Sequence, residues 1–255
     1  MGTDGAPIGY LEDFAATGTG ATKEIGILLV HGFTGSPSSM RPWAEFMHQQ
    51  GYTVRVPRLP GHGTKPEDLN EVKWQEWPRK VESELRELQK SCSKIFVFGL
   101  SMGGGLTLHT AQNHQDKLNG IVLVNPMIHI PRVTPTLAKL MSKVQKMRSA
   151  VGNDIKRKNV TEYAYDALPM IGIYELTKML KVTREKLGTV RIPTLLFHST
   201  EDHVLPVSNT EIILRGITSK DKERVELTNS YHVATLDHDM EIIFEKSLTF
   251  VKERS

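Results

Sequence analysis

The sequence predicts an α/β protein with a mostly parallel central sheet, flanked by helices and interrupted by one inserted helical segment. Short apolar runs recur along the chain, and most are followed by a stretch with helical periodicity. The runs Ile25–Val30 and Gly120–Asn125 are almost continuously apolar, which is typical of parallel strands buried on both faces. Alternating strands and helices indicate βαβ units joined into one parallel sheet.

The expected elements follow the chain in a regular order. The strands are Ile25–Val30, Tyr52–Pro57, Ile95–Phe98, Gly120–Asn125, Thr194–His198 and Arg224–Leu227, with Ile8–Phe14 as a further strand at the N-terminal edge. The helices between them are Met40–Gln50, Val81–Gln89 and Gly103–Asn113, and an amphipathic segment follows at Met240–Val251.

The alternation breaks in the segment 126–191. This segment carries 13 Lys and Arg against 5 Asp and Glu, a formal charge of +8, whereas the rest of the chain carries −5. Such an asymmetry indicates a separate structural unit. Residues 1–125 and 192–255 are therefore expected to form the core. Residues 126–191 are expected to form a helical cap over the strand ends, where open α/β sheets place their ligands.

Apolar residues at three- and four-residue spacing predict two helices in this segment. They are Val133, Leu137, Leu140, Met141, Val144 and Met147 in the first, and Ile173, Leu176, Leu180 and Leu187 in the second. Leu137, Leu140, Met141 and Val144 are expected to face the core, with Lys139, Lys143, Lys146, Arg148 and the Lys156–Lys158 cluster on the outer side. This basic face predicts a weak, transient contact with anionic lipid, and an ordinary solvated surface is the alternative.

Composition excludes several classes of protein. Of the 255 residues, 39% are hydrophobic, about 47% when the 20 glycines are added, and 24% are charged, the usual range for a globular protein rather than a disordered or collagen-like one. The single cysteine, Cys92, excludes an internal disulfide and a multi-cysteine metal site. The net charge of +3 gives no indication of nucleic-acid binding. No signal peptide or long apolar run is present, so a cytoplasmic location is expected.

The motif Gly99-Leu100-Ser101-Met102-Gly103 lies between an expected strand and an expected helix. G-x-S-x-G in this context is typical of a nucleophile elbow, a turn that needs small residues two positions either side of the serine. The turn directs a helix N-terminus at an oxygen that becomes negative. A Gly-rich phosphate-binding turn is the alternative, but no G-x-G-x-x-G or G-x-x-x-x-G-K-S/T motif is present.

His232 is the expected base for this serine. It follows the last expected strand by a few residues and therefore lies at the same sheet edge as Ser101. His238 is a weaker candidate because Asp237 and Asp239 beside it are better explained as charges at the start of the C-terminal helix. His203 is weaker still, since it adjoins the expected acid.

Asp202 is the expected acid, which orients the imidazole and stabilises its charged form. It follows the expected strand Thr194–His198 by a short turn, again at the carboxyl edge of the sheet. The neighbouring Glu201 is the alternative, because either residue could be a solvated loop acid. The chain order serine, aspartate, histidine is that of α/β-hydrolases.

Two backbone N–H groups are expected to form the oxyanion hole. Met102 follows the nucleophile, and Phe33 lies in the glycine-containing loop His31–Gly35 after the first buried strand. His31 itself is interpreted as a structural loop residue, and His62 as part of a turn. No cofactor or metal is expected for this chemistry.

Five blocks of the sequence resemble the bacterial carboxylesterase and monoacylglycerol lipase family of α/β-hydrolases. They read HGFTGSP, PRLPGHGTKPEDL, GLSMGG, STEDHVLP and SYHVATLDHD, and the resemblance runs from about Gly26 to the C-terminus. It implies the α/β-hydrolase fold with an inserted helical cap. It also implies a catalytic Ser101, Asp202 and His232, with Phe33 and Met102 as oxyanion donors.

These observations predict a serine hydrolase that cleaves carboxylic esters through an acyl-enzyme intermediate. Monoacylglycerols and other short-to-medium-chain acyl esters are the expected small-molecule substrates. A peptidase, thioesterase or acyltransferase could use the same residues. A non-catalytic ligand receptor on this fold is the alternative outside enzymes. The oligomeric state is left open.

Overall fold

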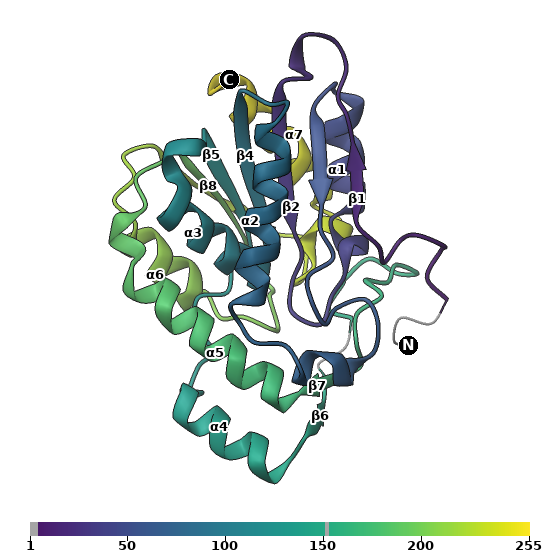
Figure 1. Cartoon of the computed structure of the whole chain (residues 1–255), viewed down its shortest axis with the longest axis vertical. Coiled ribbons are helices and arrows are strands. Elements are labelled where there is room, and N and C mark those ends of the chain that lie inside the picture. Colours follow the sequence, from purple (N-terminus) through teal and green to yellow (C-terminus); the bar gives the residue numbers. More distant parts are fainter. Residues whose placement is uncertain (1–4, 151–152) are drawn as a thin grey trace.

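The central sheet has seven strands, and all but one of them run parallel. The computed structural model describes residues 5–150 and 153–255, and within them the strand order is β1-β3-β2-β4-β5-β8-β9 (Figure 1). The strands are β1 Phe14–Ala16, β2 Ile25–Val30, β3 Thr53–Val56, β4 Lys94–Leu100, β5 Gly120–Val124, β8 Thr194–Ser199 and β9 Lys222–Leu227. The expected mostly parallel sheet flanked by helices is confirmed.

Helices cover both faces of this sheet because its strands are apolar on both sides. Alternate residues of β2 belong to different cores, with Leu28 and Val30 in one and Ile27 and Leu29 in the other. The helices of the first core are α2 Glu76–Gln89, α3 Met102–His114, α5 Met170–Glu185 and α6 Ser208–Gly216, and those of the second are α1 Arg41–Gln49 and α7 Met240–Glu253. Figure 1 shows α2 and α3 in front of the sheet and α1 and α7 behind it.

The N-terminal edge strand is shorter and later than expected. β1 begins at Phe14 and pairs antiparallel with β3, so Ile8–Phe14 is wrong as a strand except at its last residue. Gly9 has a φ of 76°, and the N–H of Tyr10 donates to the carbonyl of Pro7 at 3.0 Å. This turn prevents an extended chain before residue 14.

The chain between β5 and β8 leaves the sheet and forms α4 Pro135–Val144, β6 Met147–Ser149, β7 Ala167–Pro169 and α5. The expected helix from Val133 to Met147 is too long at both ends. The hydroxyl of Thr134 accepts the N–H of Leu137 and caps the helix, which begins with Pro135. Met147 lies in β6, which pairs antiparallel with β7. Leu187 lies beyond α5 in a separate short turn.

The apolar side of α4 does not face the core, contrary to expectation. The side chains of Leu137, Leu140 and Val144 are exposed by 42%, 60% and 84%, and Ala138 is the buried residue of the helix. α4 is the outermost element of the inserted segment and packs mainly on α5 (Figure 1). An outer helix with one neighbour buries only a narrow strip, so periodicity alone overestimated its buried face.

Among the described residues, no helix is both long and apolar enough to cross a membrane. The cytoplasmic location stays a prediction.

Candidate active site

Ser101 is the single residue between β4 and α3, and its backbone is strained. Its φ is 56° and its ψ is −120°, a conformation that is costly for a residue with a side chain. Its N–H donates to the carbonyl of Val124 at 3.0 Å, and its own carbonyl accepts the N–H groups of Gly104 and Met127 at 2.9 Å each. These bonds to the neighbouring strand end and to α3 hold the tight turn in place.

Two glycines make this turn sterically feasible. A Cβ on Gly103 would lie 2.0 Å from the carbonyl oxygen of Val30, and a Cβ on Gly99 would lie 2.3 Å from the carbonyl oxygen of Gly103. Both distances are far inside van der Waals contact with backbone atoms that cannot move aside. The G-x-S-x-G pattern is therefore a packing requirement of this turn.

Asp202 and His232 form a buried pair at the carboxyl edge of the sheet. His232 Nδ1 lies 2.8 Å from Asp202 Oδ2, and the two side chains are exposed by 8% and 2%. Asp202 Oδ1 accepts the N–H groups of Val204 and Leu205 at 2.8 and 2.7 Å. When Nδ1–H of the imidazole donates its hydrogen bond to the carboxylate, the other ring nitrogen, Nε2, is free of a proton and can accept one.

The environment of this pair keeps the carboxylate charged. Burial acts to raise the pKa of Asp202. The hydrogen bond and charge of His232, together with the N–H groups of Leu205 and Val204, lower it below its usual value of 3.8. Asp202 is therefore ionised at neutral pH and can stabilise a protonated His232.

Ser101 and His232 line one cavity of about 270 Å³. Its walls are mainly apolar, and eleven of its twenty residues belong to the segment 126–191: Met127, Ile130, Pro131, Ala150, Asp154, Glu162, Ala164, Tyr165, Leu168, Ile173 and Leu176. In the described residues, no hydrogen bond joins Ser101 Oγ to His232, and such catalytic contacts often tighten only when substrate binds.

The other acids and histidines considered in the sequence lie outside this arrangement. Glu201 is 46% exposed and pairs with Lys156 at 2.7 Å. Lys156 is therefore held at the loop that carries Glu201 and Asp202. The expectation that it shares one basic face with the lysines of α4 is wrong. His238 is exposed, and the ring of His203 bonds to Asp154.

The loop His31–Gly35 approaches the serine closely. A Cβ on Gly32 would lie 3.2 Å from the Cβ of Ser101, so glycine allows this approach. His31 Nε2 accepts the N–H of Leu59 at 3.1 Å, and Nδ1 lies 2.9 Å from the carbonyl of Gly32. Burial lowers the pKa of His31 to about 4. His31 is a neutral ring that holds the loop, and Phe33 lines the cavity.

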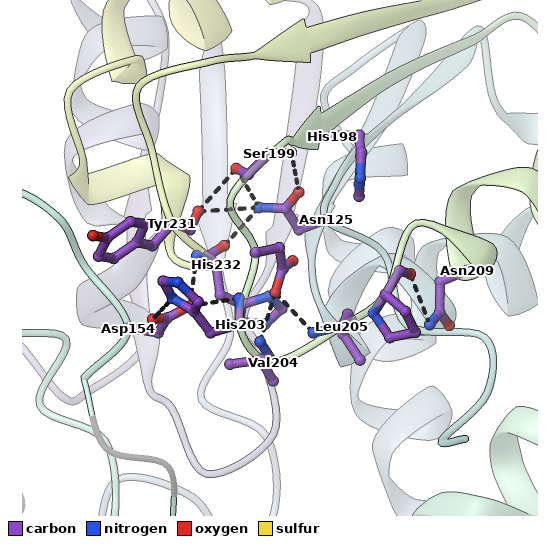
Figure 2. Close-up of polar contacts among 12 residues, drawn as sticks. Asn125, Asp154, His198, Ser199, His203, Val204, Leu205, Asn209, Tyr231 and His232 are labelled. Carbon is purple, nitrogen blue, oxygen red and sulfur yellow. Dashed lines mark hydrogen bonds and ion pairs between the residues drawn. The ribbon is translucent and has the colours of Figure 1, made fainter. Parts of the chain in front are cut away.

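Asn125 holds the loop that carries His232, a role that sequence analysis missed. It directly follows β5 and has a φ of 42°. Its amide nitrogen donates to Ser199 Oγ at 2.9 Å and to the carbonyl of His232 at 2.8 Å, and its oxygen accepts the N–H of Ser199 at 2.7 Å. Figure 2 shows this amide between the end of β8 and the loop that carries His232. The only sequence signal is a polar residue at the end of an apolar strand.

Glu162 is a second residue that the sequence did not reveal. It lines the cavity, is 8% exposed, and in the described residues its carboxyl oxygens accept no hydrogen bond. Burial raises its pKa to about 7, although the positive charge of His232 lowers it and Asp154 raises it further. Near neutral pH this carboxyl group therefore exchanges between its neutral and charged forms.

Glu162→Gln should reduce the loss of folding stability that the protein shows as pH rises. The folded-state pKa is raised above the unfolded value, so the wild-type protein loses stability as pH rises from about 4.5 to about 7. Glutamine has the same size and no charge, so the variant should match wild type at pH 5 and exceed it at pH 8. The gain should be on the order of 2 kcal/mol, a few degrees in Tm. Thermal unfolding at both pH values measures it, and equal Tm differences at pH 5 and pH 8 would contradict it.

Comparison with known proteins identifies similar lipases and esterases. The family model described as "Serine aminopeptidase, S33" matches residues 22–239. The thermostable monoacylglycerol lipase of Bacillus sp. strain H-257 is 45% identical over 226 residues, which cover 89% of this chain and 90% of that relative. The carboxylesterase of Bacillus subtilis strain 168 is 24% identical over 89% of this chain and 92% of its own length.

Solved structures show the same fold. A structure reported for the metagenome-derived lipolytic enzymes LipS and LipT matches with a TM-score of 0.90 and 38% identity, over 95% of this chain and 98% of that one. The monoacylglycerol lipase of Paleococcus ferrophilus matches with a TM-score of 0.78 and 19% identity, over 96% and 100% of the two chains. At that identity the second match supports the fold alone.

The sheet order and the serine turn are those of the α/β-hydrolase fold, and the relatives that this chain is similar to are named as lipases and esterases. The chain belongs to the serine aminopeptidase S33 family. The resemblance to bacterial carboxylesterases and monoacylglycerol lipases that the motifs indicated is confirmed.

Proposed function

We propose that this protein hydrolyses monoacylglycerols and other short-to-medium-chain acyl esters through an acyl-enzyme intermediate. The observation that carries the proposal is a serine on a strained turn in an apolar cavity, together with a histidine already paired to a buried aspartate. In this mechanism Ser101 Oγ attacks the ester carbonyl while His232 Nε2 takes its proton. Asp202 holds the imidazole and stabilises its positive charge. The alcohol then leaves with that proton, and water repeats the steps to release the acid.

The negative oxygen formed in each step needs hydrogen-bond donors that are already in place. Phe33 and Met102 are the proposed donors, through their backbone N–H groups. Met102 is the first residue of α3, where the helix dipole also favours negative charge. Phe33 directly follows Gly32, and the close approach of Gly32 to Ser101 supports this choice.

The cavity supports an amphiphilic substrate. Apolar walls suit an acyl chain, and the buried Glu162 carboxyl gives the hydroxyl groups of a glyceryl alcohol a polar partner. We further propose that residues 126–191 act as the cap of the active site, since they supply more than half of the cavity wall. The relative named as a monoacylglycerol lipase supports the choice of substrate.

A substrate panel tests this function. It contains monoacylglycerols and p-nitrophenyl esters of graded acyl length, matched thioesters, aminoacyl amides, and reactions with an added alcohol acceptor. Esters should be hydrolysed with the highest kcat/KM, with an optimum at one acyl length. The amides matter because the family description names an aminopeptidase. Faster turnover of amides, or transfer to the alcohol in place of hydrolysis, would replace the proposal. Fluorophosphonate labelling without turnover of any substrate would favour a receptor.

Activity should rise with pH as His232 loses its proton. Burial lowers the pKa of His232, but the hydrogen bond and charge of Asp202, with the charges of Glu162 and Asp154, raise it above 6.5 overall. A base must be neutral to accept a proton, so kcat/KM should be low at pH 5 and reach a plateau above the raised pKa. Measuring kcat/KM for an uncharged ester from pH 5 to 9 checks this. A flat profile would exclude a histidine base.

We also propose that the α4 surface touches anionic lipid. This surface consists of the exposed Leu137, Leu140 and Val144 with the exposed Lys139, Lys143 and Lys146. Apolar side chains beside lysines suit a lipid headgroup region, where each basic group contributes about 1 kcal/mol. Wild type should sediment with anionic vesicles at low salt but not at high salt, because salt screens the attraction.

The matched variants for this test carry three Lys→Gln changes each. Changing Lys139, Lys143 and Lys146 should abolish sedimentation, whereas changing the exposed Lys117, Lys220 and Lys252 should leave it intact. Equal, negligible sedimentation with anionic and neutral vesicles would identify an ordinary solvated surface instead.

A further inference from the structure

Asp154, in the inserted segment, contacts both loops that carry the histidine–aspartate pair. Its Oδ2 accepts the backbone N–H of His232 at 3.0 Å and that of His203 at 3.3 Å. Its Oδ1 lies 2.8 Å from His203 Nδ1. Its backbone carbonyl accepts the N–H of Val233 at 3.1 Å. Asp154 therefore binds the two successive backbone N–H groups of His232 and Val233, and both the backbone N–H and the ring Nδ1 of His203. Figure 2 shows Asp154 beside His203 and His232.

We propose that Asp154 is a positioning residue for the base, which fixes the backbone of His232 and ties it to the loop that carries Asp202. The inference rests on the proposed function, because it assigns His232 the role of base. Through Asp154, the inserted segment, which supplies most of the cavity wall, is hydrogen-bonded directly to the loops that carry His232 and Asp202.

The contacts hold His232 from two sides. Asp202 binds the ring at Nδ1, and Asp154 binds the backbone N–H of the same residue. The turn 202–205 is likewise held from inside by Asp202, which accepts two of its N–H groups, and from outside by Asp154, which accepts that of His203. A shift of either loop would change the direction of Nε2, and small misplacements of a base lower the rate strongly.

Asp154 is better suited to this role than to binding substrate, although it lines the cavity. Its side chain is only 10% exposed, and both carboxylate oxygens already accept hydrogen bonds from the protein. A carboxylate that accepts several N–H groups makes stronger bonds than a neutral acceptor. Its negative charge also adds to those of Asp202 and Glu162 in raising the pKa of His232.

Two substitutions separate the geometric and the electrostatic parts of this role. Asp154→Asn removes the charge but can keep its amide oxygen on the two backbone N–H groups. Its NH₂ group can then donate to His203 Nδ1, because a neutral imidazole can carry its proton on either nitrogen. Asp154→Ala removes every side-chain contact. Asp166→Asn is the matched control, since Asp166 lies on the same segment with an exposed side chain.

The experiment measures kcat and KM for two p-nitrophenyl esters of different acyl length from pH 5 to 9, with Tm for each variant. For Asp154→Asn we expect kcat on the plateau within about threefold of wild type. The midpoint of the pH profile should move to lower pH by roughly half a unit. For Asp154→Ala we expect kcat to fall about tenfold or more for both esters with little change in KM. Asp166→Asn should behave as wild type.

Other outcomes would overturn the proposal. An unchanged pH midpoint in Asp154→Asn together with an unchanged kcat in Asp154→Ala would exclude a positioning role. A rise in KM that differs between the two esters at constant kcat would make Asp154 a substrate contact. If Asp154→Ala fails to fold, the pH midpoint of Asp154→Asn decides, because a structural role alone would not move it.

Failure of the proposed function would be recognised separately. In that case wild type would neither hydrolyse the esters nor react with a fluorophosphonate. Titration of the His232 imidazole by NMR in wild type and Asp154→Asn still tests the inference. A lower pKa in the variant supports coupling between the two residues, and an identical pKa overturns it.

Discussion

Replacing Ser101 by alanine should abolish ester hydrolysis and fluorophosphonate labelling while the protein stays folded. In the described residues Ser101 Oγ makes no hydrogen bond, so its removal leaves no buried polar partner unpaired. The loss should reach at least about 10⁴-fold in kcat, because the remaining groups cannot form the acyl-enzyme. Tm should change by less than about 3 °C, since the side chain contributes little packing. Activity, labelling and thermal unfolding of the purified variant measure all three quantities.

Two controls make this result specific. Ser101→Gly should be equally inactive but more stable than Ser101→Ala, because glycine adopts a φ of 56° without strain. Ser142→Ala, on the outer helix α4, should keep full activity and labelling. Full labelling of Ser101→Ala would assign the nucleophile to another residue.

Asp202→Asn should fold normally and lose roughly 10⁴-fold in kcat. The amide oxygen can still accept the N–H groups of Val204 and Leu205, which turns the amide NH₂ towards His232 Nδ1. Nδ1 must then accept a hydrogen bond, so the proton moves to Nε2. A His232 protonated at Nε2 cannot accept the serine proton. Measurement of kcat at the plateau pH, with Tm as a check of folding, tests this.

Glu201→Gln is the matched control for this substitution. Glu201 is the sequence neighbour of Asp202, but its carboxylate is exposed and pairs with Lys156. An exposed ion pair contributes little, so activity and Tm should remain within about twofold and 2 °C of wild type. The reverse pattern, with Glu201→Gln inactive and Asp202→Asn active, would make the acid assignment wrong.

The core strands could be predicted from sequence because a strand buried on both faces is a short, nearly continuous run of apolar residues. β2 matches its expected bounds, and β4, β5 and β8 differ by one or two residues at their ends. The Ser101 turn was also recognisable, since its glycines are required by contacts within a few residues and with β2. The positions of Asp202 and His232 followed from these strands, because parallel strands bring their carboxyl ends to one edge.

The inserted segment was predictable only in outline. Its charge and length separated it from the sheet, but the orientation of α4 was wrong because apolar periodicity does not say what covers a helix. Asp154 and Glu162 carried no sequence signal, since each is an isolated acid in a stretch without periodicity.

The sequence by itself therefore determined the sheet, the serine turn and the identity of the candidate triad, since local packing and chain order constrain all three. Only the tertiary structure decided what surrounds that triad. It brought Asp154 and Asn125 to the backbone of His232, and it buried Glu162 in the cavity. These contacts join residues 78 and 107 positions apart. Hydrogen bonds over such separations depend on the three-dimensional path of the chain, because no local pattern of residues encodes them.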